Sequence, residues 1–149
     1  LTAEATVAHA IAFARATEAA LRCDIPPRAI VVRAVMGELE RIACHLGDLG
    51  HELTAEDAIA LGPISVLLVP VGGNYTVDAE GAAAVVERLR PAIAIPMHYR
   101  TPKTNLPLAS VDEFLAGRGR VRQVSGSELE ISADSLPEPT EIVVLQPAL

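Results

Sequence analysis

One short stretch of the chain, residues 45–51, concentrates side chains that can bind a metal ion. It reads His-Leu-Gly-Asp-Leu-Gly-His, so Asp48 has a histidine three residues to either side, His45 and His51. Carboxylate and imidazole groups in such a cluster suit Zn, Fe or Mn. A second interpretation needs no metal: His45 ends a helix, Asp48 forms a turn between glycines, and His51 is solvated. The residues alone leave both interpretations open.

Another histidine, His98, follows a predicted strand and opens a polar loop. Pro96 and Met97 precede it, and we expect them to halt the strand and to direct the next side chain outward. In an α/β layer, ligands gather at the carboxyl ends of the strands. The position therefore makes His98 a candidate ligand, although histidine has many roles besides metal binding.

Composition limits the classes of partner. The 12 basic and 19 acidic residues give a net charge of -7, which argues against a cationic face for nucleic acid. No stretch approaches the ~20 apolar residues of a membrane span. Cys23 and Cys44 have no disulfide-framework spacing, so we expect both to stay reduced in the cytoplasm. The chain begins at Leu1 with no visible signal peptide, which we take as an indication of a fragment.

The first part of the chain has a helical period. Apolar residues predict one helix that ends before Pro26 and a second that starts at Pro27, reaches Leu46 and stops at Gly47. Because the connection is short, we expect an antiparallel helical hairpin. In this interpretation Asp48 lies just after the end of a helix.

After residue 50 the pattern becomes that of an α/β layer. A buried strand at Val66–Val71, with Pro70 at its end or at a sheet edge, a helix from Ala79 to about Arg90 capped by Asp78, and a strand at 92–95 predict a βαβ unit with parallel strands. The remaining predicted elements are helices opened by Thr54 and Ser110, and strands at 121–124, 128–131 and 141–145.

Residues 44–145 resemble the C-terminal half of metallo-beta-lactamase fold hydrolases, specifically the ascorbate-phosphate-lactonase-like branch. The resemblance rests on residues 45–51, 67–73 with 75, 76 and 78, and 95–99. It implies a partial metallo-beta-lactamase-like αβ layer in which Asp48 bridges two metal ions, His98 completes the second site, and His51 lies nearby as a ligand or toward the substrate. The implied cofactor is Zn, or Mn or Fe, and the implied reaction is hydrolysis of a small-molecule ester, lactone or phosphoester.

The chain departs from this family in one respect. The family's earlier H-x-H-x-D-H motif is absent, and the chain has four histidines in total. We therefore expect at most weak metal binding and little hydrolysis unless a partner chain supplies the missing half. Half a fold also exposes a sheet edge and apolar helix faces, so we expect self-association.

The first 50 residues resemble a different family, the large subunits shared by nickel–iron hydrogenases and respiratory NADH dehydrogenase. Residues 26–29, Arg33, 38–43 and 45–50 carry this resemblance. It implies an alternative function, a structural or interaction module of such an NADH–quinone oxidoreductase subunit. We predict two units, a helical hairpin at 1–47 and the hydrolase-like half at 48–149, and hypothesise a chimera joined at their shared string. In the hydrolase family the aspartate that corresponds to Asp48 follows the end of a strand. This conflicts with the prediction that Asp48 follows the end of a helix.

Overall fold

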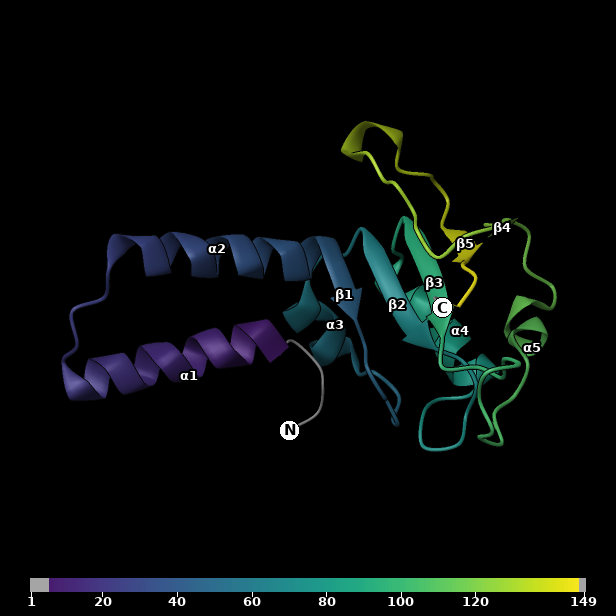
Figure 1. Ribbon diagram of the computed structural model, residues 1–149, viewed down its shortest axis with the longest axis horizontal. Helices are drawn as coiled ribbons and strands as arrows, with labels where there is room; N and C mark the ends of the chain where they lie inside the picture. Colours follow the sequence, from purple (N-terminus) through teal and green to yellow (C-terminus); the bar gives the residue numbers. More distant parts are fainter. Residues whose placement is uncertain (1–5, 148–149) are drawn as a thin grey trace.

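The chain folds into a parallel sheet with helices and a helical hairpin that projects from one edge of the sheet (Figure 1). The computed structural model describes residues 6–147, and the side chains of all of these except residues 6–9, 38, 40 and 41. The elements are α1 Thr6–Leu21, α2 Pro27–Ile42, β1 Ala43–His45, α3 Ala55–Leu61, β2 Val66–Pro70, α4 Ala79–Leu89, β3 Ile93–Met97, α5 Val111–Leu115, β4 Val121–Gln123, a 3-10 turn Ala133–Ser135 and β5 Glu141–Val144. The predicted mixed α/β class is confirmed.

The five strands are all parallel, in the order β1-β2-β3-β5-β4. The predicted βαβ unit is β2-α4-β3, and Pro70 is the last residue of β2, as expected of a residue that cannot donate to a ladder. Asp78 caps α4 by accepting a hydrogen bond from the Gly81 N–H at 2.9 Å. The carboxyl ends of β1, β2 and β3 therefore lie at the same end of the sheet.

Two apolar clusters cover the two faces of the sheet. Leu67 and Val69 of β2 pack with Val85 of α4 and Phe114 of α5, which forms the larger cluster. On the other face the buried residues are Val66, Ile93, Ile95 and Val143, against which Leu129 and Leu136 of the long connection to β5 pack. A strand buried on both faces explains the continuous apolar run of β2.

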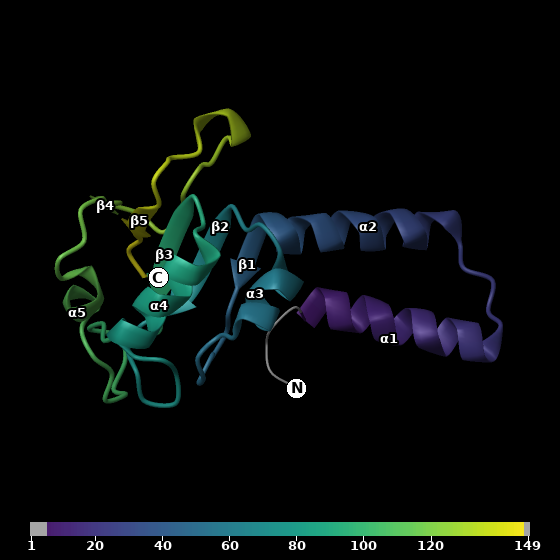
Figure 2. The same ribbon diagram turned by 180° about the vertical axis from the view of Figure 1, so that it is seen from behind.

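The N-terminal hairpin, α1 and α2, is confirmed. The two helices run side by side and extend away from the sheet at its β1 edge (Figures 1 and 2). Across them the Arg33 guanidinium donates to the Glu18 carboxylate, with Nη1 2.7 Å from Oε2. No helix within residues 6–147 is both long and apolar enough to cross a bilayer.

The predicted end of the second helix is wrong. The helix ends at Ile42, and Ala43–His45 form an edge strand that pairs with Val66–Leu68. Cys44 and Leu46 are buried in the larger cluster, and the Leu46 N–H donates to the Leu68 carbonyl at 3.0 Å. Because three residues fit a helical and an alternating pattern equally well, tertiary pairing decides between them. Asp48 therefore follows a strand, and the conflict with the hydrolase family disappears.

Two further predictions differ from the structure. No strand forms at 128–131, where Leu129 instead packs on the second sheet face as part of an irregular connection. The strand predicted at 92–95 continues through Pro96 to Met97. Pro96 is tolerated because β5 pairs only with Ile93 and Ala94, which leaves the far side of β3 without a ladder partner there.

Candidate metal centre

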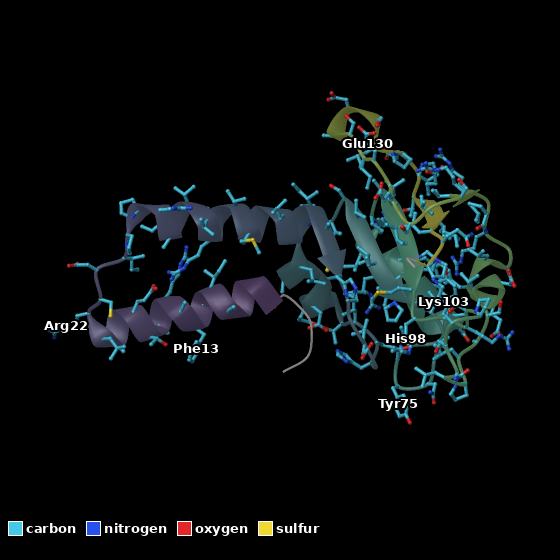
Figure 3. All side chains as sticks on the ribbon, viewed as in Figure 1. Phe13, Arg22, Tyr75, His98, Lys103 and Glu130 are labelled. Carbon is cyan, nitrogen blue, oxygen red and sulfur yellow. The ribbon has the colours of Figure 1, made fainter. Side chains whose placement is uncertain are left out.

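Asp48 and His98 meet at the edge of the sheet where the parallel strands end. Asp48 follows β1 and His98 follows β3, which lie on either side of β2. The Nδ1 atom of His98 lies 3.8 Å from the Oδ1 atom of Asp48. Figure 3 shows His98 at this end of the sheet with Tyr75, whereas Glu130 lies at the opposite end. Two of the three predicted site residues are thus brought together.

The pair has the chemistry of metal ligands and nearly their spacing. A shared tetrahedral zinc ion, with its oxygen and nitrogen ligands each about 2.0–2.2 Å away, would place the two donor atoms ~3.3–3.6 Å apart. The observed 3.8 Å is slightly longer than that separation. The Nε2 atom of His98 is buried and has no hydrogen-bond partner among the described residues. The Asp48 side chain is 80% exposed, so its carboxylate remains available to an ion.

The backbone holds His98 in a conformation that is uncommon for a residue with a side chain. Its φ angle is 51°, in the left-handed region. The preceding residue accepts a hydrogen bond, from the Val71 N–H to the Met97 carbonyl, at 3.0 Å. Gly72 packs directly against the His98 backbone, and its carbonyl accepts from the Ala109 N–H at 2.9 Å. The turn after β2 therefore fixes the turn after β3.

A second backbone contact fixes the segment that carries Asp48. The Val77 N–H donates to the Leu49 carbonyl at 2.7 Å, and Gly50 lies against the Tyr75 carbonyl. Tyr75 itself is 86% exposed, with a φ angle of 80°. The loop 72–77 thus borders the segments of both candidate ligands and presents an aromatic ring at their rim.

Tyr99 anchors the His98 loop from the other side. Its hydroxyl donates to the Leu145 carbonyl at 3.3 Å, and the ring packs against the larger apolar cluster. Burial raises the pKa of Tyr99 above its ordinary value, because the phenolate would lose solvation. Tyr99 therefore remains a neutral phenol that ties the loop to the end of β5.

His51 and His45 are placed differently. His45 is exposed, and its Nδ1 atom accepts a hydrogen bond from the Gly47 N–H at 3.0 Å. His51 is also exposed and lies toward α3, where its charge adds to the lowering of the Asp57 pKa that the Thr54 hydrogen bonds chiefly cause. Among the described side chains, no three His, Cys, Asp or Glu residues gather closely enough to hold a metal ion. His51 is therefore not brought into a common group with Asp48 and His98.

A groove of about 1020 Å³ lies at the opposite end of the sheet, where the strands begin. It is lined by Ser65, Ala92 and Thr140, which precede β2, β3 and β5, and by Arg90 among others. Parallel sheets present ligand sites at the carboxyl ends of their strands. For that reason the candidate centre is the carboxyl end of the strands, where Asp48 and His98 lie.

Sequence reasoning did not find Gly72 as part of the site. Residues 67–73 entered only as part of the family resemblance, whereas the structure places Gly72 directly against the backbone of His98. The sequence feature that could have identified Gly72 is its position directly after an interior strand, where a close approach of two backbones favours glycine.

Comparison with known proteins shows which families the part of the chain around Asp48 and His98 resembles. Residues 38–98 match the family model described as "Beta-lactamase superfamily domain". Two curated proteins are similar to the chain, both named UPF0173 metal-dependent hydrolases. The protein from Thermoplasma acidophilum is 39% identical over 84 residues, which is 56% of this chain and 37% of that protein. The protein from Carboxydothermus hydrogenoformans is 37% identical over 101 residues, which is 68% of this chain and 40% of that protein.

A solved structure gives the same result. It is a Thermotoga maritima protein assigned as a Zn-dependent hydrolase of the metallo-beta-lactamase superfamily, 41% identical, with a TM-score of 0.61 over 67% of this chain and 50% of that chain. The chain thus spans 37–40% of those two curated relatives and half of this structure. The resemblance to a metallo-beta-lactamase superfamily domain is confirmed. The narrower lactonase-like branch and the resemblance of the first 50 residues stay predictions.

Proposed function

We propose that this chain, part of which matches the metallo-beta-lactamase superfamily domain, contributes to metal-dependent hydrolysis through Asp48 and His98. The observation that carries the proposal is the approach of these two side chains at the carboxyl edge of the sheet, 3.8 Å apart. Zinc fits this donor set, and Mn or Fe would also be accepted by a carboxylate and an imidazole.

The residues of this chain would act mainly by holding the metal ion and fixing its position. The Asp48 carboxylate would bind the ion through an oxygen, and His98 would bind it through an imidazole nitrogen. A metal bound there polarises a substrate oxygen and lowers the pKa of a bound water. The hydrogen bonds between the loops keep both ligands in place before substrate arrives, and pre-organisation of this kind lowers the cost of reaching the transition state.

Two ligands do not complete a catalytic zinc site, which usually has three protein ligands and a water. We therefore propose that the chain by itself binds metal weakly and that a partner chain, or residues outside the described pair, supplies the others. His51 is the first candidate within the chain, because a local rearrangement of the exposed segment that follows Asp48 could bring it closer.

The substrate class we propose is a small-molecule ester, lactone or phosphoester. Arg100 and Lys103 follow His98 closely in the sequence and add two positive charges to the loop beside the site. Among the three substrate types, these charges favour the phosphoester, whose negative charge they would offset. The exposed ring of Tyr75 offers an apolar contact at the rim.

Metal content and hydrolysis, measured on the same preparations, test this proposal. Protein loaded with zinc is compared with Asp48→Asn, His98→Ala and the control His45→Ala, using aryl ester, lactone and aryl phosphate substrates with and without a chelator. We expect zinc retention to fall in the first two variants and to be unchanged in the control, with any hydrolysis removed by the chelator. Zinc retention that is equal in all four proteins would reject the assignment of the ligands.

We also propose that the hairpin and the sheet are separate units in origin, joined near residues 47 and 48. The feature that motivates this is the string 45–51, which the two resembled families share. In the structure α2 passes directly into β1 between residues 42 and 43, five residues before the predicted boundary. Amplification from source DNA across the codons for residues 40–55 tests it. Reads that never span this interval would support an artificial junction, and abundant spanning reads would reject it.

A further inference from the structure

The groove at the amino ends of the strands is lined by three arginines. Arg90 follows α4, and Arg118 and Arg120 lie in the connection between α5 and β4. In Figure 1 this is the end of the sheet from which the 3-10 turn projects. The carboxylates of Glu87 and Glu138 also line the groove, so the arginines leave an excess of positive charge there. Such an excess stands out in a chain whose net charge is -7.

Two of the three guanidinium groups are held in place by neutral partners. Arg118 donates from Nε to the Phe114 carbonyl at 2.8 Å and lies over the Phe114 ring, 5.0 Å from its centroid. Arg120 donates from Nη1 to the carbonyls of Glu138 and Pro139, at 3.0 and 3.2 Å. Neither arginine forms an ion pair with a described carboxylate, and each keeps further N–H groups without a described acceptor. Arginines that are fixed before a ligand arrives lose less side-chain entropy when they bind it.

Arg90 lines the groove without adding a side-chain contact to the fold. Its backbone ends α4, with a φ angle of 46° and an N–H that donates to the Val86 carbonyl at 2.8 Å. The helix dipole favours a positive charge at this position. However, among the described residues the guanidinium has no hydrogen bond and no ion pair. All of its N–H donors are therefore available to a ligand.

The loop that carries Arg118 and Arg120 also offers backbone donors. Gly117 and Gly119 alternate with the two arginines, and their N–H groups donate to no acceptor in the part of the chain that the structure describes. A Cβ atom on either glycine would meet nothing within 4 Å, so open space borders the backbone here. Free backbone N–H groups and arginine side chains are both suited to the oxygens of an anion.

We propose that this groove binds the phosphate group of a small organic molecule, independently of the metal centre. The donors come from two separate segments, the end of α4 and the loop 117–120. A phosphate monoester suits them because its three terminal oxygens accept hydrogen bonds from different directions, whereas the two oxygens of a carboxylate lie in one plane.

The rest of the groove wall suits the organic part of such a molecule. The buried apolar side chains of Ile64, Val86 and Ile142 line it. Its volume of about 1020 Å³ is close to the upper end of the ~300–1,000 Å³ that is typical of ligand sites. We therefore expect a phosphate with an apolar group attached to bind more tightly than inorganic phosphate.

Calorimetric titration of the full chain with phenyl phosphate, inorganic phosphate and benzoate, all in the presence of a chelator, tests the proposal. The chelator removes any contribution of a metal ion bound at Asp48 and His98. Arg90→Gln is the main variant, because Arg90 contributes no described side-chain hydrogen bond or ion pair to the fold. Arg28→Gln is the control, because it removes the same charge from an exposed position on α2.

We expect phenyl phosphate to bind the parent more tightly than inorganic phosphate or benzoate. Arg90→Gln should weaken its binding at least about tenfold, as expected for loss of a hydrogen bond between charged groups, and the control should stay within about twofold of the parent. A parent that binds no phenyl phosphate, an Arg90→Gln variant with the affinity of the parent, or tighter binding of benzoate would each overturn the proposal.

Amide NMR of the parent locates the bound anion without relying on a variant. We expect phenyl phosphate to shift the amide resonances of Gly117 and Gly119, whose N–H groups are free to donate. The amides of Gly50 and Gly73, near Asp48 and His98, should respond little. Shifts confined to Gly50 and Gly73 would place the anion at the candidate metal centre and reject the groove as its site.

Discussion

A Cβ atom placed on Gly72 would lie 2.1 Å from the carbonyl oxygen of His98 and 3.0 Å from the Cα atom of Tyr99. Real side chains do not approach a backbone so closely, and here the obstacle is main chain rather than the end of a flexible side chain. The turn after β2 and the turn after β3 can therefore touch only because residue 72 is glycine. His98, whose φ angle is in the left-handed region, lies at this contact.

Replacing Gly72 with alanine is expected to displace His98. The added methyl group forces the two turns apart, which should destabilise the fold by about 1–3 kcal/mol, as for other overpacked sites. Urea unfolding measures the stability, and zinc retention measures the site. The control is Gly119→Ala, where open space surrounds the new atom and φ is not in the left-handed region. Equal stability and equal zinc retention in the two variants would contradict the role given to Gly72.

Asp78 is expected to stabilise α4 as its N-terminal cap. Its carboxylate accepts from the Gly81 N–H, and α4 buries Ala82, Val85 and Val86 against the sheet. Asp78→Ala should therefore lower the free energy of unfolding by about 1 kcal/mol, whereas Asp78→Asn should retain most of it. Chemical unfolding compares these with Glu80→Ala, in the same first turn. A loss of equal size in Glu80→Ala would argue against a capping effect.

Acid should loosen the start of α3. The Thr54 N–H and hydroxyl both donate to the Asp57 carboxylate, and these hydrogen bonds lower the pKa of Asp57 in the folded chain. The stabilisation is therefore complete above the pKa of the unfolded carboxyl and is lost as the pH falls through the lower folded pKa. Amide exchange across residues 54–58 measures it. The difference between the parent and Asp57→Asn should shrink with acidification, and a constant difference would contradict this origin.

The sequence alone was sufficient for most of the α/β layer. The βαβ unit around α4, the caps at Thr54, Asp78 and Ser110, and the place of Pro70 follow from local chemistry that tertiary contacts reinforce. Such elements are predictable because capping groups and turn residues act within a few residues.

The edge strand β1 could not be predicted in the same way. Residues 43–45 continue the helical period of α2, and only pairing with β2, together with burial of Cys44 and Leu46, makes them a strand. Similarly, the sequence placed Asp48 and His98 as candidate ligands, but their approach depends on the strand order. His51 has the right chemistry and spacing, yet it lies toward α3, because local spacing does not fix where an exposed loop directs its side chains.

The central claim is that Asp48 and His98 bind one metal ion together, and ¹⁵N NMR of the histidine rings during a zinc titration tests it most directly. His98→Ala assigns the His98 resonances, and His45 serves as the internal reference. We predict that zinc shifts a ring nitrogen of His98, that the shift is lost in Asp48→Asn, and that His45 responds little. Zinc that leaves His98 unchanged, or that shifts it equally in Asp48→Asn, would contradict the account.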